Sequence, residues 1–165
     1  MERSREPNMI RYLHGDATRP VGPASESKII VHICNDEGKW GKGFVLAISQ
    51  RWEAPELAYR GAFSAASALA LGDVQFVPVE PGLEVANLIG QHGIARRGQR
   101  VPPIRYEATR QGLDAVARHA RELGATVHMP RIGCGLAGGK WEEIEPIIKE
   151  TLIDAGVAAT VYDFD

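Results

Sequence analysis

Hydrophobic positions along the chain fall into short apolar runs that alternate with longer amphipathic stretches. The segment 28–34 (KIIVHIC) is a continuous apolar run of strand length, which predicts a strand buried on both faces. The segment 104–123 instead has apolar residues at i, i+3, i+4 and i+7, from Leu113 to Ala120, and this spacing predicts a helix. Gly124 follows at the position where glycine commonly ends a helix.

The same patterns predict six strands and four helices along the whole chain. Strands are expected at 8–15, 28–34, 73–79, 83–89, 126–132 and 158–164. Helices are expected at 44–52, 54–71, 104–123 and 141–155. This alternation favours an α/β fold, with a central mixed six-stranded sheet and helices on both faces. We expect residues 1–165 to form a single domain, with residues 1–8 as a flexible tail.

Composition narrows the functional classes. With 19 basic and 21 acidic residues, the formal net charge of -2 argues against a broad nucleic-acid surface and against electrostatic membrane binding. The N-terminal segment lacks the apolar stretch of a secretion signal, so a cytoplasmic location is expected. Two cysteines, Cys34 and Cys134, exclude a disulfide framework, and they lack the spacing of a zinc site, so neither a metal nor a cofactor is expected.

Two glycine-rich segments each follow a predicted strand and precede a predicted helix: residues 38–43 (the first bend) and residues 133–139 (the second bend). Glycine permits tight turns and close approach of a ligand to backbone amides, and unpaired amides at a helix N-terminus bind phosphate. Two such bends at neighbouring strand ends would flank one crevice and suit a diphosphate. The alternative is that these glycines only make tight turns.

Two better-known phosphate motifs fit the second bend poorly. Gly133, Gly135 and Gly138 match the dinucleotide fingerprint, but no acidic residue stands at the end of a strand about 20 positions later. Residues 134–141 (CGLAGGKW) imitate a P-loop, yet Cys134 replaces the first glycine and Trp141 replaces the magnesium-binding Ser or Thr. We reject both interpretations.

Four segments resemble a known family. They are HGDAT (14–18), VHICND (31–36), the first bend GKWGKG, and MPRIGCGLAGGKWEEI (129–144). Together they resemble a macrodomain, in the branch that contains the terminal ADP-ribose protein glycohydrolase and its bacterial relatives. The resemblance implies a three-layer α/β/α fold that binds ADP-ribose in a crevice at the edge of a mixed sheet.

The resemblance also implies roles for individual residues. Asp16 would bind the adenine amino group, Phe164 would lie against the adenine, and Asn35 would lie near the distal ribose. Each of these three has a simpler alternative, as a turn cap, a packing residue and a loop former, respectively. The residues implied for binding are Asp16, Ala17, Asn35, Gly41, Gly43, Phe44, Arg131, Ile132, Gly133, Cys134, Gly135, Leu136, Ala137 and Phe164.

The chain departs from this branch at two positions that carry catalysis there. The position of the branch lysine holds Gln91, and the position of the branch aspartate holds Ala137. Because an amide cannot form a covalent adduct as a lysine amine does, a route through a positioned water is expected instead. The candidates to position that water are Asn35, Asp36 and Gln91, with His92 beside them.

We therefore expect an enzyme that hydrolyses mono-ADP-ribose from modified macromolecules, most simply from the ester link to Glu or Asp side chains. Its partners would be ADP-ribose and ADP-ribosylated protein or nucleic acid, with no membrane partner. The alternatives are a non-catalytic ADP-ribose reader and an ADP-ribose 1''-phosphate phosphatase. The segment 92–105 carries four arginines that would either be solvated or cover the crevice.

Overall fold

The computed structural model describes residues 9–65 and 68–164. The tail predicted at residues 1–8 lies outside these residues. Within them the chain forms one six-stranded sheet with the strand order β1-β6-β5-β2-β4-β3. The strands are β1 (Arg11–His14), β2 (Lys28–Asn35), β3 (Val74–Glu80), β4 (Leu83–Gln91), β5 (Thr126–Met129) and β6 (Ala159–Asp163).

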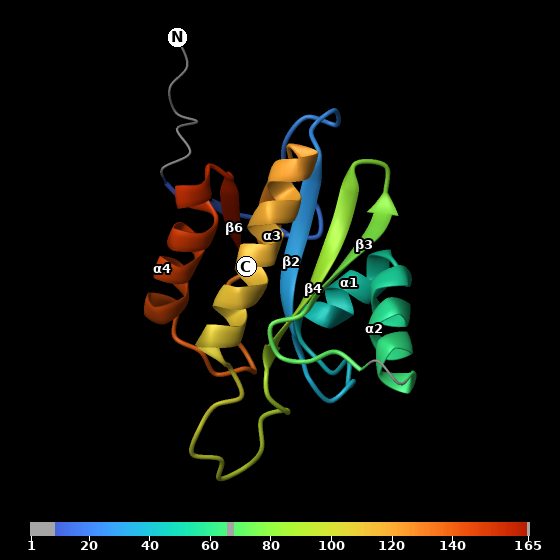
Figure 1. Cartoon of the computed structure of the whole chain (residues 1–165), viewed down its shortest axis with the longest axis vertical. Coiled ribbons are helices and arrows are strands. Elements are labelled where there is room, and N and C mark those ends of the chain that lie inside the picture. The colour runs from blue at the N-terminus through green and yellow to red at the C-terminus, as the bar shows by residue number, and fades with distance from the viewer. Residues whose placement is uncertain (1–8, 66–67, 165) are drawn as a thin grey trace.

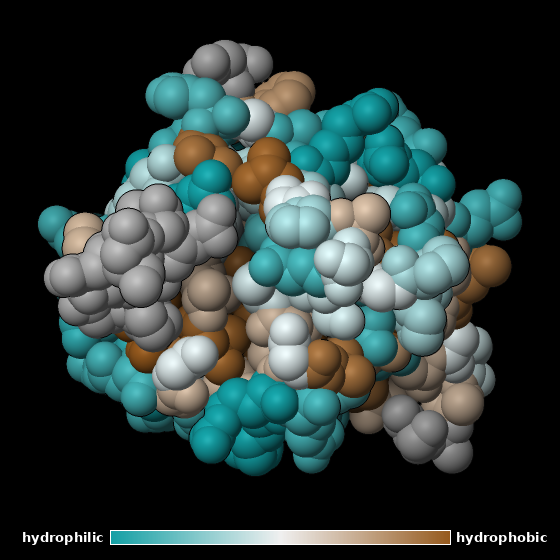
Figure 2. Space-filling view, turned by 90° about the horizontal axis from the view of Figure 1, so that it is seen from above, coloured by the Kyte–Doolittle hydropathy of each residue, from teal (hydrophilic) through white to brown (hydrophobic). Residues whose placement is uncertain are grey.

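Five strands run parallel, and β3 pairs antiparallel with β4 at one edge of the sheet. The mixed sheet predicted from the sequence is therefore confirmed. Because the parallel strands share one direction, their carboxyl ends meet at one edge, which is the lower end of the molecule in Figure 1. The opposite end, seen in Figure 2, carries mostly hydrophilic side chains with scattered apolar ones.

Helices cover both faces of the sheet (Figure 1). They are α1 (Phe44–Arg51), α2 (Ala54–Ser64), α3 (Tyr106–Leu123) and α4 (Trp141–Thr151), followed by a 3-10 turn at Ile153–Ala155. None of the helices within the described residues is both long and apolar enough to cross a membrane. The predicted three-layer arrangement of helix, sheet and helix is confirmed.

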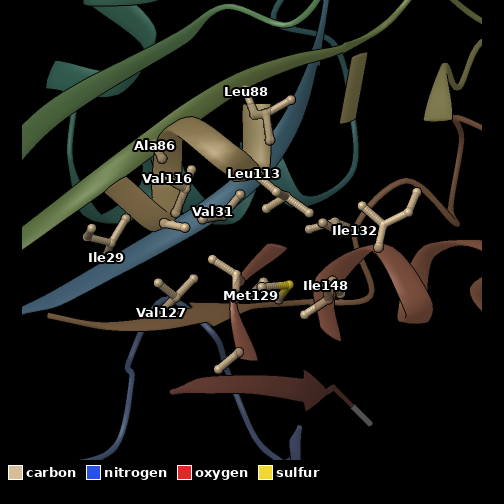
Figure 3. Close-up of a cluster of buried hydrophobic side chains, with 14 of the residues drawn as sticks. Ile29, Val31, Ala86, Leu88, Leu113, Val116, Val127, Met129, Ile132 and Ile148 are labelled. Carbon is tan, nitrogen blue, oxygen red and sulfur yellow. The ribbon is translucent and has the colours of Figure 1, made fainter. Parts of the chain in front are cut away.

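The central strands are buried on both faces, as the apolar run at 28–34 predicts. In β2, Ile29 and Val31 pack with α3 and α4 in the larger cluster, part of which Figure 3 shows. Ile30 and Cys34 face the other way and join the smaller cluster with α1 and α2. Burying each large aliphatic side chain contributes roughly 1.5–3 kcal/mol, so this alternation fixes β2 in the centre of the sheet.

Several predicted boundaries are wrong. The helix predicted at 141–155 ends at Thr151, before a separate 3-10 turn, and the strand predicted at 8–15 spans Arg11–His14. Three further differences each have a local reason. The helix predicted at 54–71 ends at Ser64, because Ala65 already has an extended backbone. The strand predicted at 126–132 ends at Met129, because Pro130 has no N–H to donate to a neighbouring strand. The helix predicted to start at 104 begins at Tyr106, because Ile104 pairs with Gln91 in an isolated β-bridge.

Candidate functional site

The two glycine-rich bends open onto the same crevice. The first bend follows β2 and the second follows β5, and these strands are parallel neighbours. A cavity of about 190 Å³ lies between the bends. The residues that line it are His32, Ile33, Lys42, Gly43, Phe44, Val45, Gln91, Pro130, Arg131, Ile132, Gly133, Gly135, Leu136 and Ala137.

The bends approach each other closely across the crevice. A methyl group placed on Gly43 would lie 3.9 Å from Cδ1 of Leu136, so these two residues bracket the opening. Gly43 has φ 84° and Gly133 has φ 75°, and both values lie in the left-handed region that favours glycine. A methyl group on Gly133 would also lie only 2.7 Å from Ile104 Cδ1. Glycine is therefore required at Gly133 by both conformation and space.

The second bend presents unpaired amide groups. Within it, the Gly138 N–H donates to the Gly135 carbonyl at 3.1 Å and the Gly139 N–H donates to the Gly133 carbonyl at 2.7 Å. The N–H groups of residues 133 and 135–137 have no hydrogen-bond partner within the part of the chain that the structure describes. Such a run of free amides is an anion-binding arrangement.

The first bend ends at the N-terminus of α1, which also lacks a partner. Gly43 is the N-cap of this helix and offers no side-chain cap, and the first turn of the helix contains no acidic residue. The partial positive charge of the helix terminus is therefore uncompensated. Lys42 and Arg131 also line the crevice, so the local field attracts an anion.

Asn35 holds the first bend in shape. Its Oδ1 accepts hydrogen bonds from the N–H of Glu37 at 2.9 Å and from the Tyr59 hydroxyl at 2.7 Å. Its Nδ2 donates to the Lys39 carbonyl at 2.6 Å. Asn35 is only 6% exposed and does not line the cavity, so its side chain serves the loop. Its predicted contact with a water stays a prediction.

The Asp36 side chain forms hydrogen bonds with the two residues that directly follow β4. Its carboxylate accepts from the Nδ1–H of His92 at 2.8 Å and from the N–H of Gly93 at 2.8 Å. Partial burial alone would raise the pKa of Asp36, but these two hydrogen bonds outweigh it and lower the pKa below its usual value. In the neutral form of the His92 imidazole, donation from Nδ1–H leaves Nε2 as the nitrogen with a free lone pair.

Gln91 is the one predicted catalytic residue that lines the crevice. Its Nε2 donates to the Gly93 carbonyl at 2.8 Å, which fixes the orientation of the side-chain amide. Its Oε1 has no partner among the residues that the structure describes and remains free to accept a hydrogen bond from water.

Arg131 lines the cavity and is paired with Asp163, the last residue of β6. Arg131 forms a bidentate pair with Asp163, with Nε–Oδ1 and Nη2–Oδ2 distances of 2.6 and 3.0 Å. The guanidinium also lies 5.3 and 5.0 Å from the ring centroids of Tyr12 and Trp141. The hydrogen bonds from Arg131 lower the pKa of Asp163. Arg131 is thus held rigidly at the edge of the crevice.

Asp16 and Phe164 lie at the carboxyl ends of β1 and β6, which are neighbouring strands. One oxygen of Asp16 accepts from the N–H and the hydroxyl of Thr18 at 2.9 and 2.7 Å, so the residue does form the turn cap considered above. Phe164 is 79% exposed and is therefore not an ordinary packing residue.

His32 is a site residue that the sequence did not single out. It lines the crevice although it is only 1% exposed, and its Nε2 donates to Asn87 Oδ1 at 2.6 Å. The Asn87 amide nitrogen donates to Gln75 Oε1, so its oxygen must be the acceptor and His32 carries its proton on Nε2. Burial lowers the pKa of His32 to about 4, and the side chain is neutral at pH 7.

The structure thus brings part of the predicted set together. Nine predicted residues line the cavity: Gly43, Phe44, Gln91, Arg131, Ile132, Gly133, Gly135, Leu136 and Ala137. Seven do not: Asp16, Ala17, Asn35, Asp36, Gly41, Cys134 and Phe164. Five further lining residues were not predicted: His32, Ile33, Lys42, Val45 and Pro130. Lys42 could have been found from the sequence, since it is one of the two lysines inside the first bend.

Comparisons with known proteins agree on one fold. No family model matches the chain. The solved structure of a protein of unknown function from Bacteroides thetaiotaomicron is 58% identical, with a TM-score of 0.90, covering 94% of this chain and 98% of that one. The structure of a macrodomain protein from Streptomyces coelicolor is 51% identical, with a TM-score of 0.80, covering 94% and 99% of the two chains.

Curated relatives are more distant. Chromodomain-helicase-DNA-binding protein 1-like from Danio rerio is 32% identical over 93% of this chain, which spans only 15% of the length of that protein. ADP-ribose glycohydrolase OARD1 from Bos taurus is 41% identical over 58 residues, which make up 34% of this chain and 38% of that protein. ADP-ribose 1''-phosphate phosphatase from Candida albicans is 23% identical over 86% of this chain and 93% of its own length.

Proposed function

This chain belongs to the macrodomain family, and we propose that it binds ADP-ribose in the crevice and hydrolyses mono-ADP-ribose from modified macromolecules, at the ester link to Glu or Asp side chains. The observation that carries the proposal is the set of unpaired amides in two facing bends, one of which begins α1. A pyrophosphate is the anion that suits two such cradles at once. The relatives described as an ADP-ribose glycohydrolase and a phosphatase of ADP-ribose 1''-phosphate support this substrate class.

The ligand would lie along the edge of the sheet in one direction. The nucleoside would occupy the end beyond β1 and β6, near Asp16, Ala17, Arg131 and Phe164. The pyrophosphate would lie between the two bends, and the distal ribose would reach the end near Gln91, beyond β2 and β4. The attached macromolecule would leave the crevice at this second end.

Hydrolysis would proceed through water rather than through a covalent adduct, because Gln91 has no nucleophilic nitrogen. Gln91 Oε1 would accept a hydrogen bond from the water and orient it toward the anomeric carbon of the distal ribose. The water oxygen forms a bond to this carbon, the bond to the ester oxygen breaks, and the Glu or Asp carboxylate leaves. Nε2 of His92 takes the proton that the water loses, while Asp36 positions the imidazole.

A reader without catalytic activity is the second candidate, and Gln91 and Ala137 favour it, because they stand where the resembled branch carries its catalytic lysine and aspartate. One paired experiment separates the candidates. An auto-modified ADP-ribosyltransferase with glutamate-linked label is incubated with the protein and release is followed, while ADP-ribose binding is measured by calorimetry.

Binding together with release supports the hydrolase, and binding without release supports the reader. Liberation of phosphate from ADP-ribose 1''-phosphate without release of protein-linked label would instead identify the phosphatase. Absence of ADP-ribose binding would contradict all three.

A further inference from the structure

The segment 92–105 (the arginine loop) is built into the edge of the crevice. At its base, Gln91 and Ile104 form a β-bridge and the His92 N–H donates to the Pro103 carbonyl at 2.8 Å. The Ile104 N–H also donates to the Ala137 carbonyl in the second bend at 3.0 Å. Asp36 beside the first bend binds His92 and Gly93. The loop is therefore fixed to both bends, and it projects below the sheet in Figure 1.

The arginine loop lies at the end of the crevice from which a macromolecule would emerge. It follows β4, and the strand order places β4 beyond β2, away from β6 and β1. Under the proposed function, on which this inference rests, that end holds the distal ribose and the residue to which it is attached. Any chain that continues from the modified residue must pass the arginine loop.

Positive charge is concentrated at this end. Residues 36–42 and 92–105 together hold six of the 19 basic residues but only two of the 21 acidic ones. The rest of the chain is correspondingly acidic. A surface with this distribution attracts a negatively charged segment at the mouth of the crevice and repels it elsewhere.

The cations on the arginine loop are available for a partner. Arg96, Arg97 and Arg100 are exposed. Arg96 approaches Glu37 at 3.5 Å and shares that carboxylate with Lys39 at 3.6 Å. Arg97 and Arg100 form no ion pair with any residue that the structure describes. Their positive charge is uncompensated beside the crevice.

We propose that the arginine loop is a docking surface for an acidic polypeptide segment that flanks the ADP-ribosylated residue, with Arg97 and Arg100 as its main contacts. An acidic polypeptide is favoured over a single-stranded nucleic acid because the loop contains no Phe, Tyr or Trp side chain on which successive bases could stack. A long polyanion would also meet the acidic remainder of the surface, whereas a short acidic segment contacts the loop alone.

The test uses the full chain and four probes: free ADP-ribose, a glutamate-rich peptide carrying one ADP-ribose on Glu, a neutral peptide with the same modification, and an ADP-ribosylated oligonucleotide. The double variant Arg97→Ala with Arg100→Ala is compared with Arg118→Ala with Arg121→Ala. The latter removes the same charge from exposed positions of α3 near its far end.

The loop variant should weaken binding of the acidic peptide roughly tenfold, or about 1.4 kcal/mol, and reduce its salt dependence, since the ion pairs that it loses are exposed and screened by salt. Its affinity for free ADP-ribose and for the neutral peptide should stay within about twofold of the wild type. The α3 variant should behave as the wild type with every probe.

Equal binding of the acidic peptide by the wild type and the loop variant would overturn the docking proposal while leaving ADP-ribose binding intact. A loss confined to the oligonucleotide would also overturn it and assign the loop to nucleic acid. Failure of the wild type to bind free ADP-ribose would instead overturn the proposed function itself.

Discussion

The hydroxyl of Tyr59 lies 2.7 Å from Oδ1 of Asn35 and 2.7 Å from the Asn35 carbonyl oxygen. Tyr59 is on α2 and is fully buried, whereas Asn35 is the last residue of β2 and starts the segment that leads into the first bend. The hydrogen bonds from Tyr59 on α2 therefore fix the position of Asn35, and with it the start of the first bend. The shape of the ligand cradle depends on a helix that makes no contact with the cavity.

Tyr59→Phe should remove these hydrogen bonds while keeping the ring in place against Trp40 and Phe63. We expect a loss of about 1 kcal/mol in the free energy of unfolding, because a buried acceptor loses its donor. ADP-ribose affinity should fall severalfold, as seen by calorimetry. Tyr106→Phe, which removes a more exposed hydroxyl that accepts from Lys140 N–H, should change neither quantity measurably. Full affinity in Tyr59→Phe would show that the bend does not need these hydrogen bonds.

Gly135→Ala tests the contribution of the second bend to ADP-ribose affinity without a change in the stability of the fold. Gly135 has no positive φ and no atom within 4 Å of an added methyl, so the variant should unfold within about 0.5 kcal/mol of the wild type. Because Gly135 lines the cavity, the methyl should enter the space of the ligand and lower ADP-ribose affinity at least about tenfold. Gly61→Ala, an equally unhindered change on α2, should leave affinity unchanged. Equal ADP-ribose affinities for Gly135→Ala and Gly61→Ala would show that the second bend is not part of the binding site.

Gln91→Ala and His92→Ala test the water-mediated route. Each should keep ADP-ribose affinity near that of the wild type and lower the rate of label release, His92→Ala by about a hundredfold, as expected for loss of a general base. Gln99→Ala, an exposed change of the same type in the arginine loop, should release label at the normal rate. Unchanged rates in both His92→Ala and Gln91→Ala would exclude the mechanism.

Stability should fall as the pH is lowered from about 7 to 5. Burial lowers the pKa values of His32 and His128 to about 4, below the ordinary value of 6.5, so between these values the unfolded chain binds protons that the folded chain excludes. At pH 5 each histidine should cost on the order of 2 kcal/mol, measured by urea unfolding. His32→Gln should remove its own share of this slope. An unchanged slope in that variant would contradict the assignment.

The sequence predicts the layers of this fold well because the spacing of apolar residues within a segment indicates which side chains of a strand or helix are buried. The run at 28–34 and the periodic segment from Leu113 to Ala120 each match an element of the structure. The ends of the helices and strands are harder to predict from the sequence. The apolar residues after Ser64 extend the helical pattern, but Leu69 and Leu71 pack into the smaller cluster from outside the helix. The apolar pattern indicates that these residues are buried, but it does not show whether their backbone is helical.

The site is predicted in part for a similar reason. The two bends were visible because glycine clusters mark backbone conformation, and the sheet order then brings them together. The pair Asp36–His92 joins residues 56 positions apart, and the pair Arg131–Asp163 joins residues 32 positions apart. A local sequence pattern cannot predict contacts between residues so far apart in the chain. The distinct roles of Asn35 and Gln91 likewise follow only from their contacts.

The central claim is that free amides in the two bends hold the pyrophosphate of ADP-ribose. The most direct measurement is a titration of the 15N-labelled protein with ADP-ribose, followed by NMR. We predict that the amide resonances of Gly43, Phe44, Gly135, Leu136 and Ala137 shift, while those of Gly82 and Gly124, outside the crevice, do not. Saturating ADP-ribose that leaves the amides of both bends unmoved would contradict the account.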